Sequence, residues 1–195
     1  MNGAPPSGFL YYPGAVSAAE ESSLVERVKA IAFQPVEMRG QIARRRTAHF
    51  GWVYGYESWQ ITPGPPLPEF LLPLRARVAV LAAVEPAALA EVLITEYPSG
   101  AAIGWHRDAP QFGVVVGVSL LSACRMRFQR GRGDARETAA VTLEPRSAYV
   151  LTGEARQGWQ HSIPPLRAAR YSITFRTLRS RERGESDGQA ALHRA

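Results

Sequence analysis

The sequence predicts a mainly β fold of the α+β class, with a β-sandwich core supported by helices. Two helix-like segments, beginning at residues 17 and 69, come before a run of six short β-rich segments. Proline and glycine separate the β-rich segments, which is typical of sandwiches and barrels. The chain has 195 residues, of which 46% are hydrophobic and 21% charged, enough for one domain with a substantial buried core.

The first half of the chain is expected to supply the helices. Residues 1–16, rich in glycine, proline and tyrosine, are predicted to be an extended lead-in. Ser17 and Glu20 match a capping box ahead of apolar residues at helical spacing, so a helix should begin there and pack one face on a sheet. A second helix, interrupted or restarted at its proline, is predicted over 69–83. Residues 39–60 are aromatic and basic, which predicts short strands joined by a glycine turn.

The second half of the chain is expected to supply the strands. Its β-rich segments are 91–97, 113–121, 125–129, 138–143, 148–151 and 171–176. The charged, glycine-containing stretch 130–136 should form a hairpin tip. We predict one domain over 1–179, followed by a polar, disordered tail over 180–195.

Charge and cysteine content indicate which partners and which cellular compartment to expect. The chain has 23 basic and 17 acidic residues, a formal net charge of +6, which favours a nucleic-acid partner. Nearly all the basic residues are arginine, a bias that also arises in GC-rich genomes, so charge alone leaves the partner open. The single cysteine cannot form an internal disulfide, and neither a secretory signal nor a bilayer-spanning run is visible. We therefore expect a cytoplasmic monomer that does not associate with membranes.

Three residues could form a metal site. His106 and Asp108 are two positions apart, so in an extended segment both side chains point to the same side and can share one ion. His161 could complete a triad of two histidines and one carboxylate. Such a triad leaves coordination positions open and suits non-haem Fe(II) that binds a cosubstrate and dioxygen. Zinc-dependent hydrolysis is the rival use of these ligands.

The segment 170–176 points to an anionic cosubstrate. Strand alternation would place Arg170, Ser172, Thr174 and Arg176 on one face and the apolar residues on the other. Two buried guanidinium groups need anions as partners, and arginine binds carboxylates through paired hydrogen bonds. A dicarboxylate would satisfy both arginines, whereas a solvent-facing strand is the alternative.

Four segments together carry a resemblance to a known family: TEYPSG at 95–100, IGWHRD at 103–108, HSIP at 161–164 and RYSITFR at 170–176. In order, spacing and residue type they resemble the AlkB-type Fe(II)- and 2-oxoglutarate-dependent dioxygenases, over roughly residues 40–178. The resemblance implies a double-stranded β-helix, or jelly-roll, core over about 90–178. It also implies Fe(II), 2-oxoglutarate and dioxygen as cofactor and cosubstrates.

The resemblance assigns roles to individual residues. It makes the iron ligands, which are also the catalytic residues, His106, Asp108 and His161. It places Tyr97 and Arg170 on the distal carboxylate of 2-oxoglutarate and Arg176 near the carboxylate that chelates iron. The further cosubstrate-binding residues are Thr95, Ser172 and Thr174.

The aromatic stretch ahead of the core resembles a substrate wall. HFGW at 49–52 is similar to the AlkB segment whose tryptophan stacks on an extruded base. This assigns base stacking to Trp52, with Tyr54 and Tyr56 as neighbouring pocket walls in a lid over 39–60. Alternating tryptophan and tyrosine are also typical of sheet core, so both interpretations stay open.

Two departures from the family pattern concern the substrate. Thr95 stands where DNA-repair members carry asparagine, and Pro110 stands where they carry an acid that meets the methylated base. The resemblance implies oxidative demethylation of nucleic-acid bases, and these departures favour RNA or single strands over duplex DNA. The alternatives are hydroxylation of modified tRNA, demethylation of a protein side chain, and a non-catalytic nucleic-acid-binding module. With a nucleic-acid substrate, the arginines at 44–46 should form a continuous basic surface at the cavity mouth.

Overall fold

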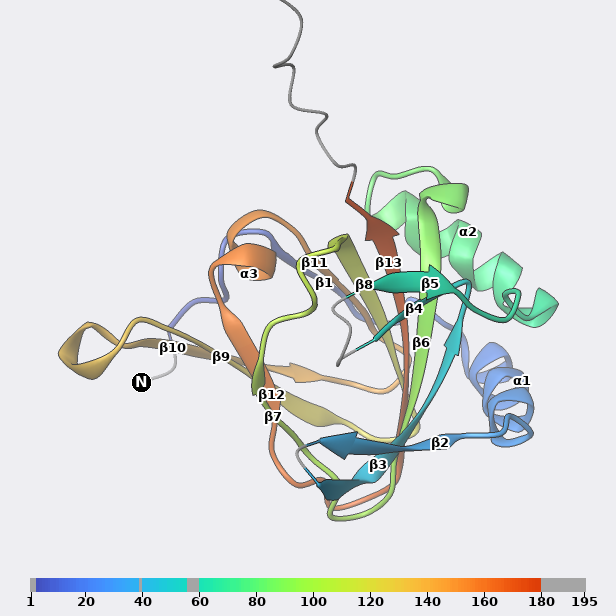
Figure 1. The fold of residues 1–195 in the computed structure, drawn as a ribbon, viewed down its shortest axis with the longest axis horizontal. Helices are drawn as coiled ribbons and strands as arrows, with labels where there is room; N and C mark the ends of the chain where they lie inside the picture. Colours follow the sequence, from blue (N-terminus) through green and yellow to red (C-terminus); the bar gives the residue numbers. More distant parts are fainter. Residues whose placement is uncertain (1–2, 39, 56–59, 180–195) are drawn as a thin grey trace, which may run out of the picture.

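The fold is a sandwich of two facing β-sheets with helices on one outer side (Figure 1). The computed structural model describes residues 3–38, 40–55 and 60–179. Neighbouring strands in both sheets are antiparallel. The larger sheet contains, in spatial order, β1 (Phe9–Tyr12), β11 (Ala148–Leu151), β8 (Phe112–Leu120), β13 (Arg170–Leu178), β6 (Leu89–Tyr97), β3 (Gln41–Phe50) and β2 (Gln34–Met38). The smaller sheet contains β10 (Glu137–Leu143), β9 (Cys124–Arg130), β12 (Gln160–Ile163) and β7 (Ile103–His106). The predicted mainly β architecture is confirmed.

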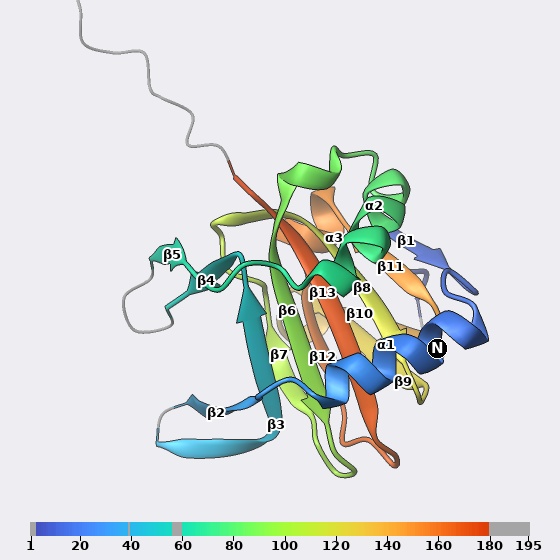
Figure 2. The same cartoon turned by 90° about the vertical axis from the view of Figure 1, so that its right-hand side faces the viewer.

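Two helices lie across the outer face of the larger sheet, as Figure 2 shows. They are α1 (Ala18–Lys29) and α2 (Leu72–Leu81), and α2 continues from the 3-10 turn η1 (Glu69–Leu71) with a proline in its first turn. The predicted capping box is present, because the Ser17 hydroxyl accepts a hydrogen bond from the Glu20 backbone N–H and the Glu20 carboxylate accepts one from the Ser17 N–H. The helices therefore begin where the sequence predicts.

Replacing Ser17 with alanine should lower the free energy of unfolding by about 1 kcal/mol, because the Glu20 backbone N–H in the first turn of α1 loses the hydroxyl that accepts its hydrogen bond. Urea unfolding measures the change, with an unchanged slope expected since the exposed surface area stays the same. Ser22→Ala, at an exposed position inside the same helix, is the control. Equal stabilities of the two variants would contradict this role for the cap.

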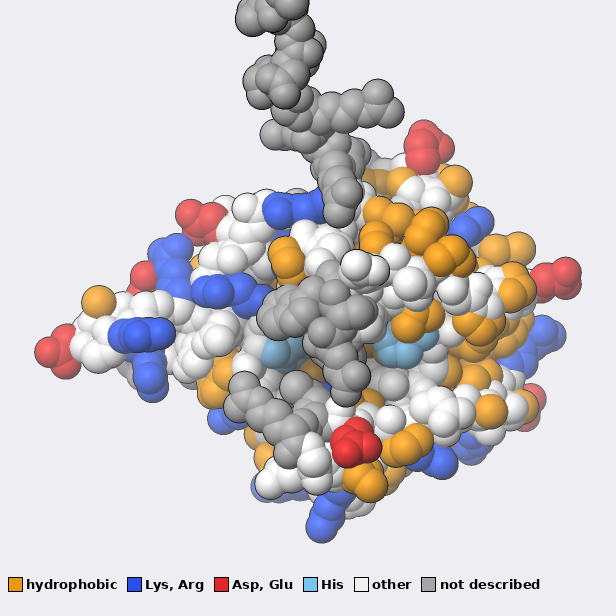
Figure 3. Space-filling model, viewed as in Figure 1, with side chains coloured by type: hydrophobic (Ala, Val, Ile, Leu, Met, Phe, Trp, Pro, Cys, Tyr) orange, Lys and Arg blue, Asp and Glu red, His pale blue; other side chains and the backbone are white. Residues whose placement is uncertain are grey.

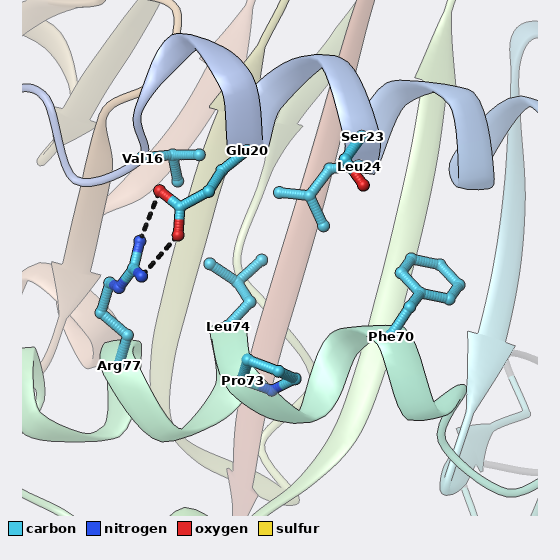
Figure 4. A pocket seen from close by; sticks show the side chains of 8 residues that line it. All are labelled: Val16, Glu20, Ser23, Leu24, Phe70, Pro73, Leu74 and Arg77. Atoms are coloured by element: carbon cyan, nitrogen blue, oxygen red, sulfur yellow. Dashed lines mark hydrogen bonds and ion pairs between the residues drawn. The ribbon is translucent and has the colours of Figure 1, made fainter.

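A small crevice between α1 and α2 has an apolar lining and one ion pair at its end (Figure 4). Arg77 on α2 donates two hydrogen bonds to the Glu20 carboxylate, at 2.5 and 3.0 Å. Hydrogen bonds from Arg77 and from Ser17 hold the pKa of Glu20 at about 2. The crevice belongs to the packing of the two helices, on the opposite side of the larger sheet from the space between the sheets.

The hydrophobic core has two parts, one on each side of the larger sheet. Strand β13 contributes apolar side chains to one of them, because Tyr171, Ile173 and Phe175 pack in the cluster beneath the helices. The alternate residues of β13 are also buried, with Arg170 1% exposed and Arg176 9% exposed. The predicted alternation is therefore confirmed, and the solvent-facing alternative is wrong.

Several short elements were not expected from the sequence. Within the lead-in, β1 pairs with β11 as an edge strand, and β2 precedes β3, which is ten residues long rather than short. Strands β7 and β12 and helix α3 (Gly153–Gln157) are too short to show a periodic pattern. The remaining elements are β4 (Trp52–Tyr54), β5 (Ile61–Pro63), η2 (Pro86–Ala88) and η3 (Gly133–Ala135).

Two predicted turns are confirmed. The β9–β10 hairpin tip contains η3, within the predicted stretch 130–136. Gly51 forms the turn between β3 and β4 with a φ of 78°, and a Cβ atom there would lie 2.0 Å from the Ala90 carbonyl oxygen. The predicted tail over 180–195 lies outside the described residues. Among the residues that are described, no helix is both long and apolar enough to cross a membrane.

Candidate active site

The space between the sheets brings together the three candidate metal ligands. His106 ends β7 and lies directly opposite His161 of β12, with their ring centroids 4.3 Å apart. Asp108 follows β7, and its Oδ2 atom lies 3.7 Å from Nε2 of His161. The three side chains adjoin but do not form a finished coordination shell, since no set of three or more His, Cys, Asp or Glu in the described part of the chain is placed to hold an ion as it stands.

A β-bulge aims His106 into the space between the sheets. Ile163 pairs with Ile103, and His161 pairs with His106, so β7 has one more residue than β12 between the two pairs. Both isoleucines face the buried cluster between the sheets. Strict alternation from Ile103 would turn His106 outward, and the extra residue restores its inward direction. Trp105 is consequently on the outside and 38% exposed.

The protonation states around this site suit metal coordination. Nδ1 of His106 lies 2.9 Å from the Gly104 carbonyl oxygen, which can only accept, so Nδ1 carries the proton and Nε2 keeps its lone pair. Burial lowers the pKa of His106, and burial lowers that of His161 to about 4, so both imidazoles are neutral at pH 7. Burial opposes ionisation of Asp108, but Arg176 and the imidazoles outweigh it and hold the pKa of Asp108 below its usual value. Two neutral imidazoles and one carboxylate are a donor set that fits Fe(II).

Arg176 is shared between two buried carboxylates. Its Nε and Nη2 atoms donate to Oδ1 of Asp108 at 3.0 and 2.8 Å. Its Nη1 atom donates to both carboxylate oxygens of Glu91 at 3.0 and 2.8 Å. These bonds engage all three nitrogen atoms of the guanidinium group. Glu91 escaped the sequence analysis because its pairing with Arg176 depends on strand register.

Arg170 is a buried cation with a free donor. It is 1% exposed, its Nε donates to the Ser119 hydroxyl at 2.9 Å, and its guanidinium lies 5.2 Å from the Tyr97 ring centroid. Its buried Nη1 has no hydrogen-bond partner within the described residues. A buried, unpaired donor on a cation is costly, so this atom marks a place for an anion such as a carboxylate. The other predicted cosubstrate residues are also buried: Thr95 on β6, and Ser172 and Thr174 on β13. Ser172 lies directly opposite Thr95 in the pairing of these two strands.

Arg156 of α3 is a second residue that the sequence analysis missed. Its guanidinium is 7% exposed and donates to the carbonyl oxygens of Ala109, Phe112 and Gly113 at 2.6, 2.8 and 3.0 Å. These carbonyls belong to the segment that directly follows Asp108. Arg156 therefore fixes the loop that carries the candidate carboxylate ligand.

The model of one protein family matches residues 8–176, and its description is "2OG-Fe(II) oxygenase superfamily". The chain belongs to this superfamily. Membership makes it a non-haem iron dioxygenase with Fe(II), 2-oxoglutarate and dioxygen as its cofactor and cosubstrates, and it rules out the rival interpretation as a zinc hydrolase.

The oxygenase is similar to curated proteins of the AlkB type. It is 28% identical over 181 residues to an "Alkylated DNA repair protein ALKBH8 homolog" from Arabidopsis thaliana, covering 80% of this chain and 51% of the relative. It is 30% identical over 166 residues to the mouse "tRNA (carboxymethyluridine(34)-5-O)-methyltransferase ALKBH8", covering 82% of this chain and 24% of the relative. The chain thus spans about half of the plant relative and about a quarter of the mouse one.

Solved structures confirm the jelly-roll fold of the oxygenase. The structure of OsALKBH1 matches with a TM-score of 0.72 and 15% identity, over 91% of this chain and 100% of that one. An oxidoreductase of the 2OG-Fe(II) oxygenase family from Burkholderia pseudomallei matches with a TM-score of 0.62 and 16% identity, over 88% and 85% of the two chains. The chain is an AlkB-type oxygenase by family, relatives and fold together.

The predicted substrate residues of the oxygenase lie on a separate small sheet. Strand β4, with Trp52 and Tyr54, pairs with β5 beside the end of β3 (Figure 2). Both aromatic residues are half-buried, and neither belongs to the two buried core clusters. The Tyr54 ring lies 6.4 Å from the Phe112 ring, which in turn lies 5.2 Å from the Arg176 guanidinium. Tyr56 lies outside the described residues.

The arginines at 44–46 do not form the continuous surface expected of them. Strand alternation sends Arg45 and Arg46 to opposite faces of β3. Arg46 pairs with Glu96 and lies over Phe33 on the helix side of the sheet, while Nη1 of Arg45 donates to the Ala102 carbonyl oxygen at 3.4 Å. Figure 3 shows basic side chains scattered around this face of the molecule, while histidine reaches the surface nearer its centre. The expected basic patch is therefore wrong.

Proposed function

We propose that this oxygenase removes an N-methyl group from a nucleic-acid base, with RNA or single strands preferred over duplex DNA. Two buried observations carry the proposal: the cluster of His106, Asp108 and His161, with Arg176 bonded to Asp108, and the guanidinium of Arg170, whose Nη1 lacks a partner among the described residues. The two histidines lie on the smaller sheet and Arg170 lies on the larger sheet that faces it. Family membership supplies the oxidative reaction class.

In the proposed mechanism, His106, Asp108 and His161 hold the iron, and Arg170 and Tyr97 hold the distal carboxylate of 2-oxoglutarate. Arg176 keeps Asp108 ionised and oriented, and it stays predicted to lie near the 2-oxoglutarate carboxylate that would chelate iron. The bound metal and cosubstrates supply the oxidation: 2-oxoglutarate and dioxygen give succinate and carbon dioxide while one oxygen atom enters a C–H bond of the substrate. On an N-methyl group the resulting hydroxymethyl amine releases formaldehyde and leaves the free amine. Thr95, Ser172 and Thr174 line the proposed cosubstrate pocket.

Nucleic acid as the substrate class is supported by three observations. The chain carries a net charge of +6, which attracts phosphate groups. The printed names of the plant and mouse relatives refer to alkylated DNA and to tRNA. Pro110 occupies the position of the acid that the DNA-repair pattern carries, which favours RNA or single strands, whose bases are extruded at less cost.

A second candidate activity is hydroxylation of a modified tRNA base without loss of carbon. The mouse relative favours it, because its printed name refers to a carboxymethyluridine in tRNA. The two activities leave different products, since demethylation removes a methyl group and releases formaldehyde, whereas hydroxylation adds one oxygen atom. The cytoplasmic location, the monomeric state and the single domain over 1–179 stay predictions.

A turnover screen tests the substrate class. The purified chain with Fe(II), 2-oxoglutarate and oxygen is incubated separately with methylated DNA oligonucleotides, tRNA and methylated peptides. Mass spectrometry then measures the mass of each product. We expect mass loss on RNA or single strands, with binding that weakens steeply as salt rises. Mass gain on tRNA would support the second candidate. Activity confined to peptides, with salt-insensitive binding, would refute the nucleic-acid substrate.

Trp52→Ala should weaken binding of a nucleic-acid substrate by about 10-fold, because stacking of one base on an aromatic ring contributes about 1–3 kcal/mol. Fluorescence anisotropy with a labelled oligonucleotide that the screen identifies measures the affinity. The substrate-free conversion of 2-oxoglutarate to succinate is the internal control and should stay unchanged, since Trp52 lies on the small outer sheet. Unchanged nucleic-acid affinity would show that Trp52 is not the stacking residue.

A further inference from the structure

Glu91 is a buried carboxylate to which neither the sequence pattern nor the family resemblance assigns a role. It is 1% exposed and lies directly across from Arg176 in the pairing of β6 with β13. Both of its oxygens accept hydrogen bonds from Nη1 of Arg176. Nδ1 of His49 lies 3.5 Å from Oε1 without a hydrogen bond to it. Arg176 is thus the partner that holds Glu91 within the described structure.

Glu91 is not needed to neutralise Arg176. Asp108 already supplies one negative charge to this arginine, through Oδ1. A second buried carboxylate adds a negative charge that must be desolvated, so charge balance alone does not account for it. Its distinctive effect is geometric. Glu91 binds Nη1, while Asp108 binds Nε and Nη2. Because the guanidinium is planar and bonded on both sides, it cannot rotate away from Asp108.

We propose that Glu91 is a positioning residue for Asp108 and acts through Arg176. The inference rests on the proposed function, because it takes Asp108 as an iron ligand. With Nη1 held by Glu91, the edge formed by Nε and Nη2 stays on Oδ1 of Asp108. The other oxygen, Oδ2, then stays on the side of His161, where the metal would bind. Glu91 therefore prepares the carboxylate ligand before metal and cosubstrate arrive.

Metal affinity of the apo-protein tests this role without relying on turnover. Isothermal titration calorimetry with Mn²⁺, in the absence of 2-oxoglutarate, is run on the wild-type chain and on Glu91→Gln. We expect binding to weaken about 10-fold, since loss of a group that orients a metal ligand typically weakens affinity by about 10- to 100-fold. Glu96→Gln is the matched control on the same strand, because Glu96 pairs with Arg46 on the helix side of the sheet. Its Mn²⁺ affinity should equal that of the wild type.

A double-mutant cycle tests whether the effect passes through Arg176. In an Arg176→Gln background, Glu91→Gln should weaken Mn²⁺ binding by less than about 2-fold, because its partner is already gone. If Glu91→Gln weakens Mn²⁺ binding by the same factor in the wild-type and Arg176→Gln backgrounds, Glu91 acts independently of Arg176. Melting temperatures and near-ultraviolet circular dichroism check that each variant is folded. Glu91→Met, which replaces the carboxylate by an apolar side chain of similar length, carries the same expectation if Glu91→Gln does not fold.

The outcomes separate this inference from the proposed function. Wild-type affinity in folded Glu91→Gln, or in Glu91→Met if that variant is used, would overturn the positioning role while leaving the metal site intact. Absence of Mn²⁺ binding by the folded wild-type chain would instead overturn the assignment of the ligands, and the positioning role with it. Weakened binding in Glu91→Gln, unchanged binding in Glu96→Gln and a non-additive cycle together establish the role.

Discussion

Asp108→Ala should lower the turnover of 2-oxoglutarate by more than about 100-fold, which exceeds the upper end of the loss expected from removing a group that merely orients a ligand. The proposed metal site would then keep two neutral imidazoles and lose its only carboxylate. The fold should survive, because Arg176 keeps its hydrogen bonds to Glu91 and is not left as an unpaired buried charge. Succinate formation in the presence of Fe(II) measures the turnover, and the melting temperature reports on the fold.

Asp134→Ala, on the exposed β9–β10 hairpin tip, is the matched control and should retain wild-type turnover. His106→Ala should behave like Asp108→Ala. Full turnover by folded Asp108→Ala would mean that another carboxylate completes the metal site.

Arg170→Lys should raise the concentration of 2-oxoglutarate needed for half-maximal turnover by about 10- to 100-fold. Lysine keeps the positive charge but loses the planar fork that binds a carboxylate through two parallel hydrogen bonds. Lysine also lacks the Nε–H group that donates a hydrogen bond to Ser119. That bond holds the arginine guanidinium over the Tyr97 ring. A charge-assisted hydrogen bond contributes about 1.5–3 kcal/mol, and 1.4 kcal/mol corresponds to a factor of ten.

Initial rates of succinate formation over a 2-oxoglutarate series measure this change, and Mn²⁺ affinity should stay at the wild-type value because Arg170 makes no bond to the metal ligands in the described structure. Arg125→Lys, at an exposed position on β9, is the control. An unchanged 2-oxoglutarate requirement in Arg170→Lys would place the distal carboxylate on another residue.

The inward direction of the β13 arginines could be predicted from the sequence, because alternation is a local property of a strand. Tyr171, Ile173 and Phe175 mark one face, so Arg170 and Arg176 must lie on the other. The family resemblance added what alternation cannot supply, namely which distant segments meet. It joined His106 to His161, and the structure places these residues opposite each other on β7 and β12.

Other features depend on three-dimensional pairing and could not be predicted. The bulge that turns His106 inward is visible only when β7 is aligned with β12. The contact of Glu91 with Arg176 depends on the register between β6 and β13. The run of arginines at 44–46 looked like one surface in the sequence, but a strand sends successive side chains to opposite faces. The same alternation that correctly placed the β13 arginines therefore excludes the basic patch.

A crystal structure of the chain with Mn²⁺ and 2-oxoglutarate, grown without oxygen, tests the central claim most directly. The account predicts one ion bound by His106, Asp108 and His161, with the distal carboxylate of 2-oxoglutarate on the free Nη1 of Arg170. It also predicts that Arg176 still bridges Asp108 and Glu91. An ion held by other residues, or a 2-oxoglutarate molecule that does not contact Arg170, would contradict the account.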